Sequence, residues 1–458
     1  MKAITEFFFD GEYLKKLITI ALPISAQFFV MSALNMVDVI MIGQSGEVPI
    51  AAVGIGNQIY FVFSVFVFGI SAGTSIFCSQ YWGKKEIKNI HRTMGIGLTL
   101  DMSVAFIFSL AALLIPSILM ALYSNDLNVV TLGSKYLRIV ALSYIFTSLT
   151  VTFSATLRST EHVMLPMIAS IIAICMNTTL NYILIFGKFG FPALGAEGAA
   201  IATLISRAVE CLLILSMTYI RKYPAAIPVR SIFDYSVSFL KKYIHIVFPA
   251  FMTEACWAIG VTTYMSIYAK ISTDAIAAIN IASTIETLSY VFFIGIAQGS
   301  GILIGKTIGE NDNTKLHNLT WRSITFVIFF AFIMGMVLVL ISHPITALYK
   351  IEKDTAFFVR NILIILGCFF WVKSGNMLFV DGILRNGGDT RFSFFLNFLP
   401  IYLIGIPAAV IGTFLLHLPV YIVYLAINFE ELIRFIAGIM RIRSWKWVNN
   451  LVTEEDVA

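Results

Sequence analysis

A carboxylate lies inside the first apolar stretch of the chain. Residues 14–43 begin with two lysines and stay apolar for more than the roughly 20 residues that cross a bilayer, yet Asp38 stands near the end of this stretch. A carboxylate at the bilayer centre costs roughly 2.5–3.5 kcal/mol on insertion scales, so such a residue marks a candidate functional site. Helical spacing places Asn35, Asp38 and Ile42 on one face.

An acid in these surroundings has two possible functional roles. It can exchange a proton near neutral pH, because burial disfavours its charged form, or it can bind Na⁺ where other oxygens gather around it. The alternative is a structural acid that is hydrogen-bonded to a neighbouring helix. We expect Asp38 to bind the coupling ion of a transport process.

Two asparagines further along the chain can supply oxygens to such a site. Asn177 and Asn181 are four residues apart and therefore share one face of a helix. Their amide oxygens suit an alkali cation, and they also suit the proton of a neutral acid. The alternative is that these amides only join helices through hydrogen bonds. The next apolar stretch, GAAIATLIS, has small residues that allow close helix contact and includes Thr203.

The second half of the chain has three further acids in apolar stretches. Glu254 is a candidate for binding cation or substrate, or else an acid near the membrane surface that bonds to the backbone. Glu286 is a candidate for lining a cavity. Asp381 is a further candidate for binding substrate or cation, but it precedes Arg385 by four residues, so the two can instead simply pair on one helix face. Lys373 is a candidate partner of Asp381 or Glu254.

Other polar residues in apolar stretches have more ordinary explanations. Arg207 and Glu210 are three residues apart and are expected to pair. A cluster at the membrane interface is expected from Glu430, Glu431 and Arg434. For Asp101 the sequence identifies no partner and no role.

The composition predicts that these residues are positioned by an all-α integral membrane protein. The chain is 59% hydrophobic and 12% charged, whereas soluble domains carry about 25% charged residues. The five cysteines have neither disulfide nor metal spacing. Twelve transmembrane helices are predicted, at residues 13–42, 50–80, 92–119, 132–157, 164–187, 196–220, 240–269, 275–305, 320–346, 356–383, 392–414 and 417–440.

The basic residues alternate between the two sides of these helices. The loops on one side, together with both termini, carry 22 lysines and arginines, and those on the other side carry 7. This bias predicts that both termini lie in the cytoplasm. The net charge of +5 is spread over short loops, so we expect no nucleic-acid partner.

An internal duplication divides the chain into two halves. Residues 69–91 align without gaps to residues 295–317, with six of 23 positions identical, and Pro23 and Pro249 keep the same offset of 226. Each half has six helices, so both enter the membrane in the same direction. Parallel repeats of this kind are a transporter architecture with the substrate site at the repeat interface.

The repeat and the loop composition together predict the domain boundaries. These are an N-terminal six-helix bundle at 1–220, a cytoplasmic linker at 221–240, a C-terminal six-helix bundle at 241–440 and a cytoplasmic tail at 441–458.

Several separated motifs carry a family resemblance. They are MVDVIMIG after Pro23, LNYILIFGKFGFPALGAEGAAIATLISR, FPAFMTEACWAIG, LRST and GILRNGGDTRF. Together they resemble the multidrug and toxic compound extrusion (MATE) family, in the bacterial branch that includes the NorM transporters. The resemblance covers essentially all twelve helices. It implies a V-shaped transporter that exports bulky, often cationic drugs in exchange for Na⁺ or H⁺.

The resemblance also assigns roles to individual residues. The family's acid in helix 1 falls on Asp38, its pair in helix 5 on Asn177 and Asn181, and its threonine in helix 6 on Thr203. An acid shortly after the proline of helix 7 falls on Glu254. Some members have an aspartate at the position of Asn181, so the choice between Na⁺ and H⁺ stays open.

These observations predict a secondary multidrug antiporter of the bacterial plasma membrane. We expect a monomer that is not an enzyme and needs no cofactor besides the coupling ion. The segment GKTIGEND lacks the first glycine of a phosphate-binding loop, so ATP is not expected to drive transport. Pro23 frees a backbone carbonyl, so helix 1 could bend when Asp38 changes its charge.

Three other functions fit the sequence less well. A flippase for lipid-linked oligosaccharides or other lipids would hold phosphates with many arginines and lysines, and few bases lie inside the apolar stretches. A channel would need a continuous pore without coupling, which a twofold repeat with buried acids fits poorly. An enzyme embedded in the membrane would need a nucleophile with its base, or a metal cluster, and the sequence has neither.

Overall fold

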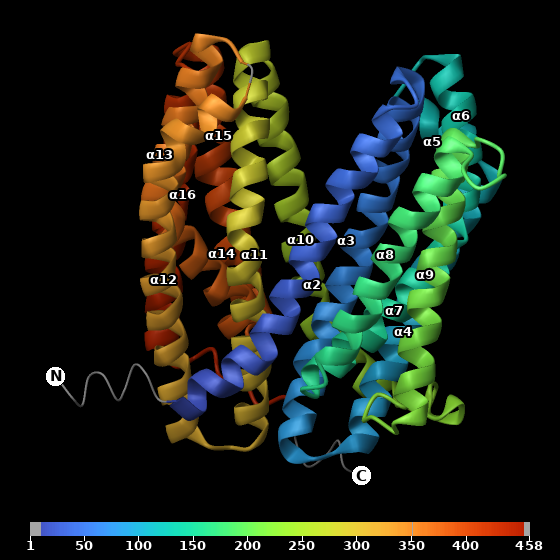
Figure 1. Cartoon of the computed structure of the whole chain (residues 1–458). Helices are drawn as coiled ribbons and strands as arrows, with labels where there is room; N and C mark the ends of the chain where they lie inside the picture. The colour runs from blue at the N-terminus through green and yellow to red at the C-terminus, as the bar shows by residue number, and fades with distance from the viewer. Residues whose placement is uncertain (1–10, 350, 453–458) are drawn as a thin grey trace. The chain divides into compact units, whose positions relative to one another are not determined.

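The computed structural model describes residues 11–349 and 351–452, and within these ranges all secondary structure is helical. In the first half of the chain the helices are α2 (Gly11–Gly43), α3 (Glu47–Lys84), α4 (Ile87–Leu114), α5 (Pro116–Ala121), α6 (Leu127–Ala141), α7 (Ser143–Ser159), α8 (Met164–Phe186) and α9 (Gly195–Ile220) (Figure 1). A short turn of 3₁₀ helix, η1 (Val229–Ser231), lies in the linker between the halves.

The second half of the chain has three stretches of π-helix among its α-helices. Its elements are α10 (Val237–Ala269), α11 (Thr273–Gly309), α12 (Asn313–Leu348), α13 (Lys353–Met377), η2 (Leu378–Leu384), α14 (Thr390–Pro400), η3 (Ile401–Gly405), α15 (Ile406–Val410), η4 (Ile411–Leu415) and α16 (Val420–Arg443). The π-helical stretches are η2, η3 and η4. Such stretches often occur at functional sites.

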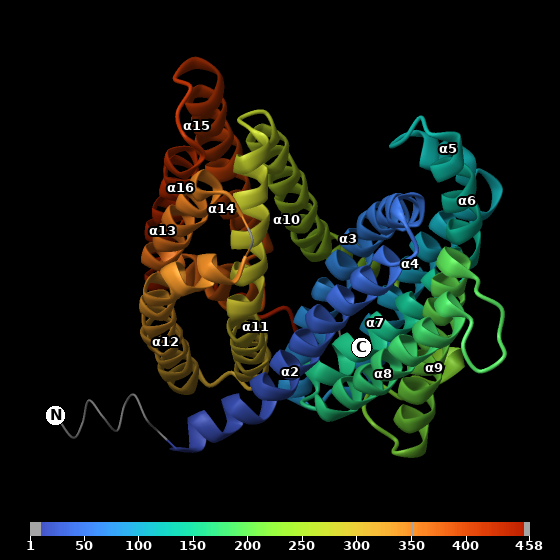
Figure 2. The ribbon, with the colours of Figure 1, turned by 45° about the horizontal axis from the view of Figure 1, so that its top comes forward.

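The twelve predicted helices all have counterparts in the structure, so the predicted all-α fold is confirmed. Among the described residues, ten helices are long and apolar enough to cross a membrane, and α6 with α7, bent by 45°, makes an eleventh span. The twelfth is α16, whose central turns carry two glutamates and an arginine. In two views α8 lies beside α9 and α12 lies beside α13 (Figures 1 and 2).

The helices form two compact units. The N-terminal unit comprises residues 26–247, and the described part of the C-terminal unit comprises residues 11–25 and 248–452. Consequently, α2 and α10 each contribute to both units. The domain boundaries predicted from the repeat, 1–220 and 241–440, stay a prediction.

A proline lies close to each point where a helix passes from one unit to the other. Pro23 is inside α2 and Pro249 is inside α10, within two residues of the respective boundary. Proline removes one backbone hydrogen bond and clashes with the carbonyl four residues earlier. A helix can therefore change direction at these two points.

Each unit has a closely packed interior of its own. In the N-terminal unit the rings of Phe63 on α3 and Tyr144 on α7 are stacked at 4.6 Å between centroids. In the C-terminal unit Gly335 on α12 faces Gly367 on α13, and a Cβ atom built on Gly335 would lie 2.2 Å from the carbonyl oxygen of Gly367. Glycine at both positions lets the two helix backbones approach closely.

Candidate functional site

The structure brings together three residues that the sequence singled out. Nδ2 of Asn181 on α8 donates a hydrogen bond of 2.8 Å to Oδ1 of Asp38 on α2. The same nitrogen lies 3.2 Å from Oδ1 of Asn177, one helical turn earlier. All three residues belong to the N-terminal unit.

This cluster has oxygen atoms available for a ligand. Asn181 is only 2% exposed, and its Oδ1 atom has no hydrogen-bond partner. Buried polar atoms are normally paired, so an unpaired one calls for an explanation. The carboxylate of Asp38 and the amide oxygens of Asn177 and Asn181 are hard oxygen donors, which suit a cation of the alkali or alkaline-earth type. The arrangement can equally hold a proton on Asp38.

The base that acts on Asp38 is ion-paired with a different acid. Arg207 on α9 acts electrostatically on Asp38 but forms its ion pair, 2.9 Å between Nη1 and Oε2, with Glu210. Glu210 also accepts a hydrogen bond of 2.5 Å from Ser170, which in turn accepts one of 2.7 Å from Gln27. The predicted pair of Arg207 and Glu210 is confirmed, and Asp38 can change its charge without leaving Arg207 unpaired.

The fourth residue that the sequence assigned to this site is not hydrogen-bonded to Asp38 in the described part of the chain. This residue, Thr203, is on α9, one turn before Arg207. Asn35 belongs to the residues whose side chains lie outside the described part. Next to the site is an open hollow of about 510 Å³ between α2 and α8, lined by Met41, Gln44, Thr178, Thr179, Tyr182 and Phe186.

In the C-terminal unit the predicted acids are paired with bases. Arg385, at the end of the π-helix η2, donates from Nη2 to Oε1 of Glu254 at 2.8 Å, and the same nitrogen lies 3.1 Å from Oδ1 of Asp381. The pairing of Asp381 with Arg385 that the sequence suggested is confirmed. One guanidinium thus serves two carboxylates, which leaves this group with one surplus negative charge.

Lys373 pairs with Glu286, so the predicted pairing of Lys373 with Asp381 or Glu254 is wrong. Lys373 precedes Arg385 by twelve residues, which is about 18 Å along a helix, and the two bases therefore meet acids at different depths. The Lys373 ammonium also lies 6.0 Å from the ring centroids of Tyr290 and Tyr424. Aromatic faces attract cations at this distance.

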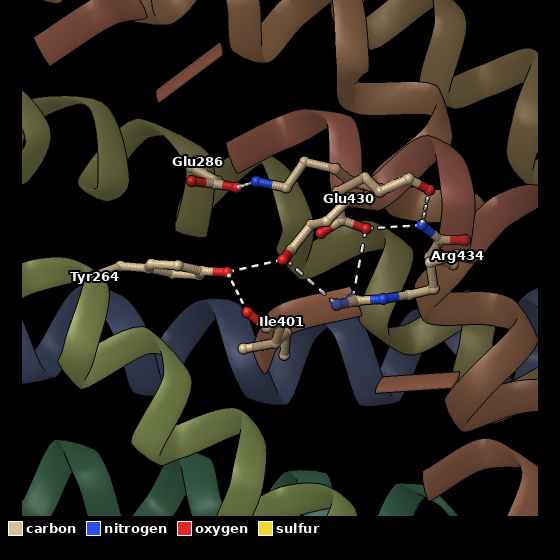
Figure 3. A network of polar contacts seen from close by, with 8 residues as sticks. Tyr264, Glu286, Ile401, Glu430 and Arg434 are labelled. Atoms are coloured by element: carbon tan, nitrogen blue, oxygen red, sulfur yellow. Dashed lines mark hydrogen bonds and ion pairs between the residues drawn. The ribbon is translucent and has the colours of Figure 1, made fainter. Parts of the chain in front are cut away.

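A buried network surrounds the acids of α16 (Figure 3). The Tyr264 hydroxyl donates a hydrogen bond of 2.7 Å to Oε2 of Glu430, and Arg434 lies 3.5 Å from both Glu430 and Glu431. Nδ2 of Asn376 donates to Oε2 of Glu431 at 2.7 Å. The predicted cluster of Glu430, Glu431 and Arg434 is therefore confirmed, and its place at the membrane interface stays a prediction. Glu430 is only 3% exposed, and Tyr264 from α10 helps to cover it.

Gly405 makes room for this network. A Cβ atom on Gly405 would lie 1.9 Å from the Tyr264 hydroxyl and 2.0 Å from Oε2 of Glu430. Gly405 ends the π-helix η3, which begins directly after Pro400. The sequence analysis missed both Tyr264 and Gly405. The prolines near Gly405 were an available signal of irregular helix, whereas nothing in the sequence distinguishes Tyr264 from the other tyrosines.

A family model matches this chain twice. The model, described as MatE, covers residues 23–183 and 249–411. The two matched ranges begin at Pro23 and Pro249 and therefore have the offset of the internal repeat.

Relatives and solved structures resemble the whole length of the chain. The "Probable multidrug resistance protein NorM" of Photorhabdus laumondii is 26% identical over 404 residues, which is 87% of this chain and 88% of the relative. The "Uncharacterized transporter YisQ" of Bacillus subtilis is 25% identical and covers 94% of this chain and 93% of its own length. The fold is similar to that of the Vibrio cholerae MATE transporter VcmN, crystallised as a D35N mutant, with a TM-score of 0.87, 19% identity and coverage of 96% and 99%. A MOP superfamily transporter from Pyrococcus furiosus gives a TM-score of 0.84 at 19% identity, with coverage of 95% and 96%.

Proposed function

This chain belongs to the MatE family, and on that premise we propose that it is a secondary antiporter that exports organic, often cationic, compounds in exchange for inward-moving Na⁺ or H⁺. The names of several relatives, which refer to multidrug resistance, support this proposal. The protein would work as a monomer in the bacterial plasma membrane with both termini in the cytoplasm, as the loop charges predict.

The observation that carries the proposal is the hydrogen bond from Asn181 to Asp38, with Asn177 bonded in turn to the same Asn181 nitrogen. A carboxylate whose hydrogen-bond partner is an amide can gain or lose a cation without breaking an ion pair. Binding of the coupling ion there would favour the conformation that releases the drug outside. Thr203 would supply a further hydroxyl oxygen after a small movement of α9.

The acids of the C-terminal unit would act on the exported compound. Glu254 and Asp381 share Arg385, and their surplus negative charge would attract an organic cation. Glu286 is neutralised by Lys373, so it would contribute only when that pair opens.

The test is efflux of a fluorescent organic cation from proteoliposomes under an imposed Na⁺ gradient and, separately, under a pH gradient. Wild type is compared with Asp38→Asn, and Asp126→Asn is the matched control because Asp126 is exposed and caps α6. We expect one gradient to drive efflux. Asp38→Asn should lower that efflux roughly 5–150-fold, which corresponds to a typical coupling free energy of about 1–3 kcal/mol. Asp126→Asn should not change the efflux.

Two results would contradict the proposal. If Asp38→Asn transports as well as wild type, Asp38 does not bind the coupling ion. If neither gradient drives efflux by folded protein, the next candidate is a lipid flippase. In the C-terminal unit, however, the bases Lys373, Arg385 and Arg434 are already paired with carboxylates, which leaves none of these three to hold a phosphate.

A further inference from the structure

A second aspartate of the N-terminal unit has no place in the proposed transport site. Asp101 lies in the middle of α4 and is fully buried, with 0% exposure. Among the described residues no lysine, arginine or histidine forms an ion pair with it. The one base on α7, Arg158, is six residues beyond the residue that Asp101 contacts there, which is about 9 Å along the helix.

Hydroxyl groups surround this carboxyl group on two sides. Oγ1 of Thr152 on α7 donates a hydrogen bond of 2.5 Å to Oδ2 of Asp101. The Ser71 hydroxyl on α3 faces the same carboxyl group. Ser148, one turn before Thr152 on the same face of α7, is also fully buried.

Two of these atoms are left without a partner. Neither Oδ1 of Asp101 nor Oγ of Ser71 has a hydrogen-bond partner at normal distance and angle. An ionised carboxylate has two acceptor oxygens and no donor, whereas a protonated one has an O–H group to donate. A hydrogen bond between Oδ1 and Oγ of Ser71 would satisfy both atoms, and the neutral acid can form it by donating Oδ1–H. The serine hydroxyl can equally donate to an ionised carboxylate, so complete burial without a base is what favours the neutral acid.

We propose that Asp101 is a second proton-binding residue of the N-terminal unit, separate from Asp38, and that it holds its proton on Oδ1 as a neutral carboxylic acid. Three observations carry this inference. The side chain is completely buried, it has no base beside it, and the unpaired oxygen of Asp101 faces an unpaired hydroxyl. A buried carboxylate without a partner is unfavourable in its charged form.

A proton fits this place better than a metal cation. The oxygens at hand are the carboxyl group and the hydroxyls of Ser71, Thr152 and Ser148, and the carbonyls of the surrounding helices are engaged in helical hydrogen bonds. The titratable groups that face this cluster, Tyr243 of α10 and Cys78 of α3, carry no charge in their ordinary state.

The position of Asp101 connects it to the start of α10. Tyr243 is fully buried, and its hydroxyl is 2.7 Å from Oγ1 of Thr74. It also lies close enough to Asp101 to interact with it electrostatically. This part of α10, up to residue 247, belongs to the N-terminal unit. Loss of the proton would place a negative charge beside the tyrosine that holds this segment.

The test is infrared difference spectroscopy of the purified full chain in lipid nanodiscs at neutral pH. Samples with ¹³C-labelled aspartate identify the carbonyl stretch of a protonated aspartic acid. We expect this band in wild type and in Asp38→Asn, and its loss in Asp101→Asn. If Asp101→Asn instead loses a carboxylate band and the acid band stays, Asp101 is ionised and the proposal is overturned.

Two milder variants keep the test decisive if Asp101→Asn does not fold. Ser71→Ala removes the acceptor of the proposed O–H bond, and Thr152→Val removes the donor to Oδ2. Both should shift the frequency of the acid band, and no shift in either variant would overturn the proposal. The last measurement repeats the wild-type spectrum after addition of NaCl. If Na⁺ removes the acid band, the site binds a metal cation and the assignment to a proton is wrong.

Discussion

Two acids of the N-terminal unit, unlike the ion-paired Glu210 of the same unit, are balanced differently from the acids of the C-terminal unit. Asp38 and Asp101 accept hydrogen bonds from neutral side chains, an amide and a hydroxyl. Glu254, Glu286 and Glu430 instead contact Arg385, Lys373 and Arg434, respectively.

This difference separates acids that can change their charge from acids that hold the fold together. Protonation of an acid with neutral partners leaves no charge behind. Protonation of an acid in a buried ion pair leaves an uncompensated base, which is strongly unfavourable. We therefore expect ion exchange in the N-terminal unit, whereas the ion pairs of the C-terminal unit should stabilise the fold in addition to any attraction of the exported cation.

The largest effect is expected where one base serves two acids. Arg434→Met removes the base from both Glu430 and Glu431, and loss of one partner of a buried pair costs about 3–5 kcal/mol. The melting temperature of the purified protein in detergent should fall strongly. Arg434→Met combined with Glu430→Gln should regain part of the loss, and an unchanged melting temperature in the single variant would contradict the structural role.

The comparison itself is tested by two matched amide variants. Glu286→Gln leaves Lys373 without its acid and should lower stability by roughly 2–4 kcal/mol, somewhat less than for a fully buried pair. Asp38→Asn leaves no base unpaired and should change stability by about 1 kcal/mol or less, the value of one ordinary hydrogen bond. Equal losses in thermal or denaturant unfolding would show that the two units do not differ in this way.

A smaller loss is expected from a methyl group at Gly405. Gly405→Ala would displace Glu430 or Tyr264 from the bond between them, and overpacking of this kind costs about 1–3 kcal/mol. Gly54→Ala on α3 is the control, because nothing lies within 4 Å of its Cβ position. If both variants melt at the same temperature, the space at Gly405 is not needed by the network.

The two prolines near the unit boundaries give the next comparison. Pro23 is in the helix of the exchangeable Asp38, and Pro249 is in the helix of the paired Glu254. Pro23→Ala should therefore reduce ion-driven efflux by a few-fold, and Pro249→Ala should reduce it less. Full transport and full ion coupling in Pro23→Ala would rule out bending of α2 as part of the mechanism.

The smallest effect is expected at Thr203. Thr203→Val removes one hydroxyl that makes no hydrogen bond with Asp38 in this structure, and a single hydrogen bond contributes about 0.5–1.5 kcal/mol. The apparent affinity for the coupling ion, measured from efflux at varied Na⁺ or H⁺ concentration, should weaken by at most about tenfold. A complete loss of coupling would place Thr203 among the direct ion ligands.

The sequence by itself determined the features that depend on short-range pattern. The lengths of the apolar stretches predicted the helices, because crossing a bilayer requires a continuous apolar helix. The spacing of Asn177 and Asn181 placed their amides on one face, and their distance from one another in the structure agrees. The constant offset between Pro23 and Pro249 revealed the repeat, which the family model then matched twice.

Only the tertiary structure decided which residues from different helices meet. Lys373 could reach several acids by sequence, but its depth along α13 selects Glu286. Tyr264 and Glu430 are 166 residues apart, and they meet where Gly405 leaves space. The physical reason is that periodicity specifies the face a residue occupies on its own helix, whereas the packing of the helices specifies which face lies opposite and at what height.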